Sequence, residues 1–314
     1  MIMIYKKTTY IIHLLLLLAG VTTLAQQDPQ YTQYMYNMSV LNPGYATDDS
    51  ETINLGLLYR AQWVGSVGGP TTASFFAHSS ITNRVEGGIS IVHDEIGGVV
   101  KETKAFADIA YVLPVGETHR LSLGIKAGAT FFSTNFNGFV YSDPLPDPAF
   151  ASNLSKTFPN IGAGAFYFGN QFYLGFSAPN LLRTKHLEKE SGVVMNGVEE
   201  IHMFMTGGYV FQANSNLKLK PAFMSKMVSG APLSLDLTLN ALLNDNFELG
   251  VGYRFDDSVS ALVNIRVAPP IRIGYSYDYT LSNLGKFNSG SHEIMILFDI
   301  NTSEKGYDKS PRFF

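Results

Sequence analysis

Apolar side chains recur at every second position through most of the chain from residue 52 onward, in segments that each end at a turn. In one such segment Leu121, Leu123 and Ile125 alternate with Ser122 and Gly124. Successive side chains of a β-strand point to opposite faces, so a period of two indicates strands with one apolar face. The pattern predicts an all-β domain.

About fourteen segments carry this alternation, and an even strand count is typical of single-chain outer-membrane barrels. The predicted strands span residues 52–60, 71–80, 85–93, 104–113, 119–131, 158–168, 171–179, 201–211, 217–227, 233–240, 247–254, 258–267, 271–279 and 291–300.

The connections between these segments sort by length. Those after even-numbered segments are short and rich in turn-forming residues, whereas those after odd-numbered segments include every long one, with 94–103, 133–157 and 180–200 among them. Two odd connections, 229–232 and 255–257, are short exceptions. Bacterial barrels have short periplasmic turns and longer external loops. We therefore expect a periplasmic N-terminus and external long loops.

Alternation alone does not show which face is wet, because a soluble sandwich alternates as well. Charged residues make up only 15% of the chain, against roughly 25% in soluble domains. No apolar stretch after residue 25 approaches the roughly 20 residues of a helical span. The expected fold is a closed transmembrane antiparallel β-barrel, since an open edge would leave backbone groups unpaired in lipid. Its lumen would hold charges of both signs, namely Arg60, Asp108, Lys126, Lys218, Lys220, Asp236, Glu248, Arg254, Arg266, Arg272 and Asp278.

The first 25 residues have the features of a secretory signal peptide: Lys6 and Lys7, then an apolar run over 11–21 and a small-residue exit ending at Ala25. The chain has no cysteine, which excludes disulfides and a lipoprotein anchor. The expected organisation is a signal peptide over 1–25, an N-terminal plug or periplasmic segment over 26–50, the barrel over 51–300 and a C-terminal tail over 301–314.

Two stretches outside the predicted strands are candidate partner-binding sites. The segment after the signal peptide is polar and aromatic, with Tyr31, Tyr34 and Tyr36, and it alternates poorly. It would lie either in the lumen or against a periplasmic partner. The loop carrying Asp143 and Asp147 lacks the glycine and terminal glutamate of a recognised calcium loop, so a stiff external loop is favoured.

The sequence contains no motif that indicates a catalytic or cofactor-binding site. Ser177 near Gly175 and His78 beside two serines are the nearest hydrolase material, but no Gly-x-Ser-x-Gly elbow exists. The histidines show no metal-ligand spacing, and a net charge of −4 without a basic patch argues against nucleic acid. We expect no catalytic residue, no cofactor, no metal and no nucleic-acid partner, so the protein is not expected to be an enzyme.

Aromatic residues recur on one face of the strands, including Tyr275, Tyr277 and Tyr279. They could form a ligand platform, but they more often form girdles at the two membrane interfaces, which is the interpretation that we favour. The barrel would then be in contact with outer-membrane lipid.

Several separated motifs resemble the PorP/SprF family of type IX secretion system outer-membrane proteins. They are QDPQYTQYMYN at Gln27–Asn37, LNPGYA at Leu41–Ala46, RAQW at Arg60–Trp63 with GPT at Gly69–Thr71, GFSAPN at Gly175–Asn180, GYSYD at Gly274–Asp278, SHEIM at Ser291–Met295 and SPRFF at Ser310–Phe314. The resemblance covers nearly all of residues 26–314.

This resemblance implies an outer-membrane barrel of Bacteroidota that helps to secrete, or hold at the surface, large cargo proteins with a C-terminal sorting domain, including gliding adhesins. It also implies contact with type IX secretion lipoproteins or peptidoglycan-associated components. The family supplies no catalytic residues. The alternative is an outer-membrane porin or small-solute channel, since the same architecture with an open lumen conducts.

Overall fold

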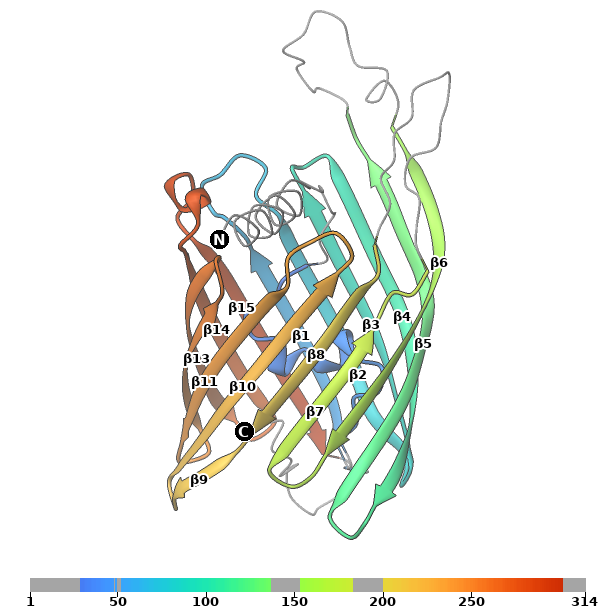
Figure 1. Ribbon diagram of the computed structural model, residues 1–314, viewed down its shortest axis with the longest axis vertical. Coiled ribbons are helices and arrows are strands. Elements are labelled where there is room, and N and C mark those ends of the chain that lie inside the picture. The colour runs from blue at the N-terminus through green and yellow to red at the C-terminus, as the bar shows by residue number, and fades with distance from the viewer. Residues whose placement is uncertain (1–28, 48, 50–51, 137–152, 183–199, 302–314) are drawn as a thin grey trace, which may run out of the picture.

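The computed structural model describes residues 29–47, 49, 52–136, 153–182 and 200–301, which form one β-barrel (Figure 1). The described strands are β1 (Thr52–Ala61), β2 (Thr71–Thr82), β3 (Val85–Ile96), β4 (Val100–Val115), β5 (His119–Thr134), β6 (Ser155–Phe168), β7 (Phe172–Ala178), β8 (His202–Tyr209), β9 (Phe211–Asn214), β10 (Leu217–Val228), β11 (Ser234–Leu243), β12 (Phe247–Arg254), β13 (Ser258–Ala268), β14 (Ile271–Thr280) and β15 (Ser291–Asn301). The short helices are η1 (Tyr34–Tyr36), α2 (Met38–Leu41) and η3 (Asn283–Lys286).

Consecutive strands pair antiparallel along the chain, β10 with β11 included, except that β8 pairs with β10 and not with β9. β1 pairs with β15, from Thr52 opposite Asn301 to Ala61 opposite His292, and closes the barrel. β8 and β9 both pair with β10 and are two parts of one wall strand interrupted at Val210. The barrel therefore has fourteen wall strands, which confirms the predicted fold class.

The burial pattern is that of a membrane barrel and the reverse of a soluble sandwich. On β5 the apolar Leu123 and Ile125 are 48% and 64% exposed, whereas Ser122 and Lys126 are 0% and 3% exposed. Apolar side chains thus cover the outer face, where lipid replaces water, and polar side chains fill the lumen. The burial pattern therefore shows that the apolar face of each strand points outward and the polar face points into the barrel.

Most of the charges predicted to point inward do so. Arg60, Asp108, Lys126, Lys220, Asp236, Glu248, Arg254, Arg272 and Asp278 are all buried in the lumen. The two exceptions, Lys218 and Arg266, lie near the predicted periplasmic rim and are half-buried, and the Lys218 ammonium pairs with Asp245 at 2.6 Å.

Two predicted connections are much shorter than expected, because the strands run on past their regular alternation. The expected loop 94–103 is wrong: β3 and β4 continue to Ile96 and Val100, and Gly97 and Gly98 turn the chain at φ +68° and +69°. Three residues join the two strands, and Val99 N–H closes the turn on the Ile96 carbonyl at 3.2 Å. Gly97 and Gly98 hold its two central positions, where glycine adopts positive φ without a steric cost. Likewise β11 extends to Leu243, through half of 241–246, and the chain turns at Asn244 and Asp245.

Aromatic side chains lie on the outer face toward both ends of the barrel. Tyr275 and Tyr279 on β14 and Phe131 on β5 approach the end that carries the long connections, and Tyr111 and Tyr209 approach the opposite end. This is the arrangement of two interface girdles. Among the described residues, no helix has the length and apolar character needed to cross a membrane.

Candidate functional site in the barrel lumen

Residues 29–47, called here the lumenal segment, lie inside the barrel (Figure 1). The segment contains η1 and α2, and every residue from Tyr31 to Thr47 is buried. Its sequence shows no regular alternation of apolar and polar residues, because the barrel wall surrounds the segment on several sides and none of its faces is turned to solvent. Its polar backbone groups need partners from the wall, and the charged lumenal residues supply many of them.

The first anchor joins the start of the segment to three wall strands. The Glu293 carboxylate on β15 accepts hydrogen bonds from the backbone N–H groups of Thr32 and Gln33 at 2.9 and 2.8 Å. Arg60 on β1 bridges Asp278 at 2.7 Å and Glu293 at 3.3 Å, and it donates to the Thr32 hydroxyl at 2.9 Å. The arginine thus offsets two carboxylates that the segment uses as acceptors.

The second anchor surrounds the Tyr36 hydroxyl. Tyr36 donates a short hydrogen bond to Glu248 on β12 and accepts one from Arg272 at 3.1 Å. Asn240 and Asn264 donate to the same carboxylate at 2.6 and 3.0 Å. Burial, reinforced by the Glu248 charge, raises the pKa of Tyr36 well above its usual value, so this phenol stays protonated and remains a donor.

A third set of contacts holds the end of α2 against the opposite wall. The Lys126 ammonium donates to the Val40 carbonyl at 2.7 Å, and Ser177 donates to the Leu41 carbonyl at 2.8 Å. These carbonyls belong to the last turn of a helix, where no intrahelical donor is available. Ser177, the nearest candidate nucleophile in the sequence, here caps a helix end.

The last contact fixes the exit of the segment toward β1. The Glu86 carboxylate accepts from the Thr47 N–H and hydroxyl at 2.7 and 3.0 Å, and His78 Nε2 lies 2.7 Å from the same oxygen. His78 therefore orients a glutamate that binds the segment. The anchors together reach strands on all sides of the barrel.

Glycines in the wall let the lumenal segment approach closely. A Cβ at Gly124 would lie 2.0 Å from the Pro43 carbonyl oxygen, and one at Gly164 would lie 2.0 Å from Asn42 Oδ1. Side-chain-free positions on β5 and β6 thus form the surface on which the turn at Asn42–Gly44 rests.

We expect Gly124→Ala to displace the lumenal segment, because the added methyl group would clash with the backbone carbonyl of Pro43, which cannot rotate away as a side chain can. The expected cost is about 1–3 kcal/mol of stability, typical of overpacking. The measurement is limited proteolysis of the purified barrel, with cleavage within 29–47 read by mass spectrometry. Gly252→Ala is the matched control, because its Cβ would lie 3.3 Å from the nearest atom, Cβ of Ser260. Equal protection of the segment in both variants would contradict the expectation.

The predicted partner-binding residues fall into two groups. Tyr31, Tyr34 and Tyr36 are 3%, 0% and 2% exposed inside the barrel, and the Tyr34 hydroxyl lies 3.2 Å from that of Thr238. A partner could reach these rings only if the segment left the lumen, so partner binding by them stays a prediction. Asp143 and Asp147 lie outside the described residues, as do the predicted signal peptide and residues 302–314 of the tail.

The sequence predicts that these charged residues point inward, but it does not predict that they bind the lumenal segment. Two features pointed in that direction, namely the poor alternation of residues 26–49 and the large number of inward charges. Among residues 29–47, 49, 52–136, 153–182 and 200–301, no group of three His, Cys, Asp or Glu side chains is arranged to hold a metal ion.

Comparison with known proteins gives one family match. A family model described as "Type IX secretion system membrane protein PorP/SprF" matches residues 23–298. No curated protein matches the chain.

Several solved structures also match. They include the Acinetobacter baumannii outer membrane protein Omp33, at 9% identity over 81% of this chain and 100% of that chain, with a TM-score of 0.44. The P. putida toluene transporter TodX matches at 8% identity over 86% and 95%, and the CymD monoaromatic hydrocarbon channel at 12% over 86% and 92%, both with a TM-score of 0.48. At these scores and identities the matches support no functional inference.

Proposed function

Since this chain belongs to the PorP/SprF family of type IX secretion system membrane proteins and is an outer-membrane component of that system, we propose that it supports the secretion or surface anchoring of a large cargo protein with a C-terminal sorting domain, such as a gliding adhesin. In this proposal the barrel binds and positions its partners and catalyses no reaction.

The observation that carries the proposal is the occupied lumen. The lumenal segment crosses the barrel interior and is hydrogen-bonded to strands on all sides, including β1, β5, β12 and β15. A polypeptide cargo could not pass while the segment stays in place. A barrel of this kind suits a docking or anchoring role at the membrane better than the role of a conduit.

The two predicted faces of the barrel would meet different partners. The connections 133–157 and 180–200 leave from strand ends that we assign to the cell exterior, and in this proposal they contact the cargo domain. The short turns at the other end would face type IX secretion lipoproteins or peptidoglycan-associated components. Both assignments rest on the loop asymmetry and on family membership.

The test is deletion of the encoding locus, followed by mass spectrometry of the cell surface and the medium. We expect selective loss of one or a few large proteins that carry a C-terminal sorting domain, with recovery when the wild-type chain is supplied in trans. Unchanged secretion together with altered uptake of small solutes would instead support a porin.

Removal of the long connections should separate cargo display from barrel assembly. We expect a variant lacking residues 137–152 and 183–199 to reach the outer membrane, because its wall strands are intact, and to lose most cargo display. Surface labelling of the cargo measures the loss, and heat-modifiable gel migration checks the barrel. Normal display by an assembled double deletion would remove these loops from the proposal.

A further inference from the structure

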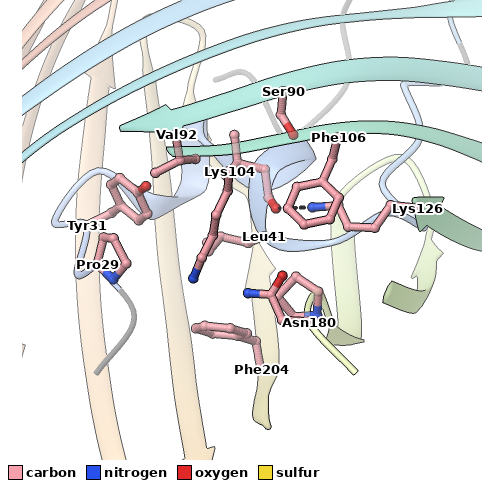
Figure 2. A pocket seen from close by; sticks show the side chains of 12 residues that line it. Pro29, Tyr31, Leu41, Ser90, Val92, Lys104, Phe106, Lys126, Asn180 and Phe204 are labelled. Carbon is pink, nitrogen blue, oxygen red and sulfur yellow. Dashed lines mark hydrogen bonds between the residues drawn. The ribbon is translucent and has the colours of Figure 1, made fainter. Parts of the chain in front are cut away.

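A pocket lies between the lumenal segment and the barrel wall, and nothing in the proposed function uses it (Figure 2). The space between the atoms that line it, with the part open to solvent included, is about 430 Å³. Tyr31 and Leu41 of the segment form one side, and Val92 of β3 and Phe204 of β8 form others. The lining is mostly apolar, so the pocket suits the body of an apolar molecule.

Two of the polar groups in this lining converge on the same space. Figure 2 shows the Lys104 ammonium and the Asn180 amide nitrogen pointing toward one another across the pocket. Both residues are 6% exposed. An acceptor atom placed between these groups would receive hydrogen bonds from both, one of them charge-assisted.

The Asn180 side chain is not committed to the wall. Its Oδ1 is buried and has no hydrogen-bond partner among the described residues. The unpaired Oδ1 is an acceptor and cannot bind a carboxylate, so it shows only that the wall does not hold this amide through its oxygen; the donor that faces the pocket is Nδ2. Asn180 directly follows β7 and Pro179, which also lines the pocket and has a fixed φ. Its backbone is therefore held at the pocket edge.

The local charge favours an anion. Lys126 lies 4.9 Å above the Phe106 ring at the pocket wall, and Lys226 lines an adjoining pocket that shares Tyr31 and Leu41. Lys104 is paired with Glu102 at 2.9 Å, and Lys126 interacts electrostatically with Asp108. Ammonium groups around a low-dielectric pocket raise the local concentration of small anions.

We propose that this pocket binds a small organic carboxylate with an apolar body, its carboxylate between Lys104 and Asn180 and its apolar part against Tyr31, Leu41 and Phe204. The carboxylate supplies the acceptor that both donors face. The apolar body fills a space that inorganic anions leave unfilled. Because the segment forms one side of the pocket, the bound acid also contacts the segment that occupies the lumen.

The test uses 4-fluorobenzoate and the full-length mature barrel in lipid nanodiscs, with the fluorine NMR linewidth as the readout. We expect the barrel to broaden the probe resonance beyond the effect of empty nanodiscs, and excess hexanoate to reverse the broadening. The neutral 4-fluorobenzamide should bind about tenfold more weakly or worse, because it lacks the charge-assisted contact.

Lys104→Met and Asn180→Leu are the site variants, and Lys218→Met is the control for the loss of one lysine, since Lys218 lies at the rim in an exposed pair with Asp245. We expect each site variant to weaken 4-fluorobenzoate binding about tenfold and the control to leave it unchanged. Heat-modifiable migration confirms that each variant folds. No broadening by the wild-type barrel, equal binding by Lys104→Met, or equal displacement by inorganic phosphate would overturn the proposal.

Discussion

Planar bilayers containing the wild-type barrel will show small and infrequent current steps, and deletion of residues 29–47 will raise the single-channel conductance roughly tenfold or more, because a fourteen-strand wall is wide enough to hold water once emptied. The segment that fills the lumen is buried from Tyr31 to Thr47 and carries η1 and α2. Its removal exposes the charged lumenal residues to solvent and leaves the strand pairings of the wall intact.

The deletion needs a second variant, because the segment also stabilises the barrel. Gly124→Ala keeps the whole chain and displaces the turn at Asn42–Gly44, so it should give a conductance between those of the wild type and the deletion. Gly252→Ala should conduct like the wild type. A wild-type conductance as large as that of the deletion variant would show that the segment does not close the lumen and would favour the porin alternative.

The second large effect is expected from Glu248→Ala. This carboxylate is 0% exposed and accepts from Tyr36, Asn240, Asn264 and Arg272. Its removal leaves a buried arginine and several donors without their common acceptor. Breaking a buried pair in this way costs about 3–5 kcal/mol. We expect a loss of that size in the free energy of unfolding.

Two further variants make this measurement specific. Glu248→Gln keeps the volume and one acceptor oxygen and should lose less than Glu248→Ala. Lys218→Met removes the exposed partner of Asp245 and should change stability by at most about 1 kcal/mol. Urea unfolding in lipid vesicles can be followed by the fluorescence of Trp63, the single tryptophan of the chain. A loss for Glu248→Ala no larger than for Lys218→Met would contradict the role of this anchor.

The wall could be predicted from the sequence because strand alternation is a local property. The face of β5 that carries Leu123 and Ile125 is apparent from the chain itself, and so is the opposite face with Lys126. The tight turn at Gly97 and Gly98 escaped prediction, because charged and β-branched residues on both sides blur the alternation. The interruption of the wall strand at Val210 could not be predicted for a different reason, since it depends on the register of β8 and β9 against β10.

For the contacts in the lumen, the sequence predicted which charged residues point inward but not which partner each of them binds. Asp236 and Arg254 face each other across the β11–β12 hairpin, so their ion pair follows once the turn is placed. The pair of Arg60 with Asp278 joins β1 to β14 across β15 and depends on how the barrel closes. The position of Tyr36 against Glu248 depends in addition on an irregular segment whose path no periodic pattern describes.

The anchor at Glu293 also has a consequence for the order of assembly. Thr32 and Gln33 lie near the start of the described residues, yet they bind a carboxylate 261 and 260 residues away, on the last strand of the wall. Contacts of such high sequence separation form late and slow folding, because a long loop must close first. Docking of the lumenal segment at Glu293 therefore depends on the last wall strand, and we expect closure of the wall and docking of the segment to form one cooperative step.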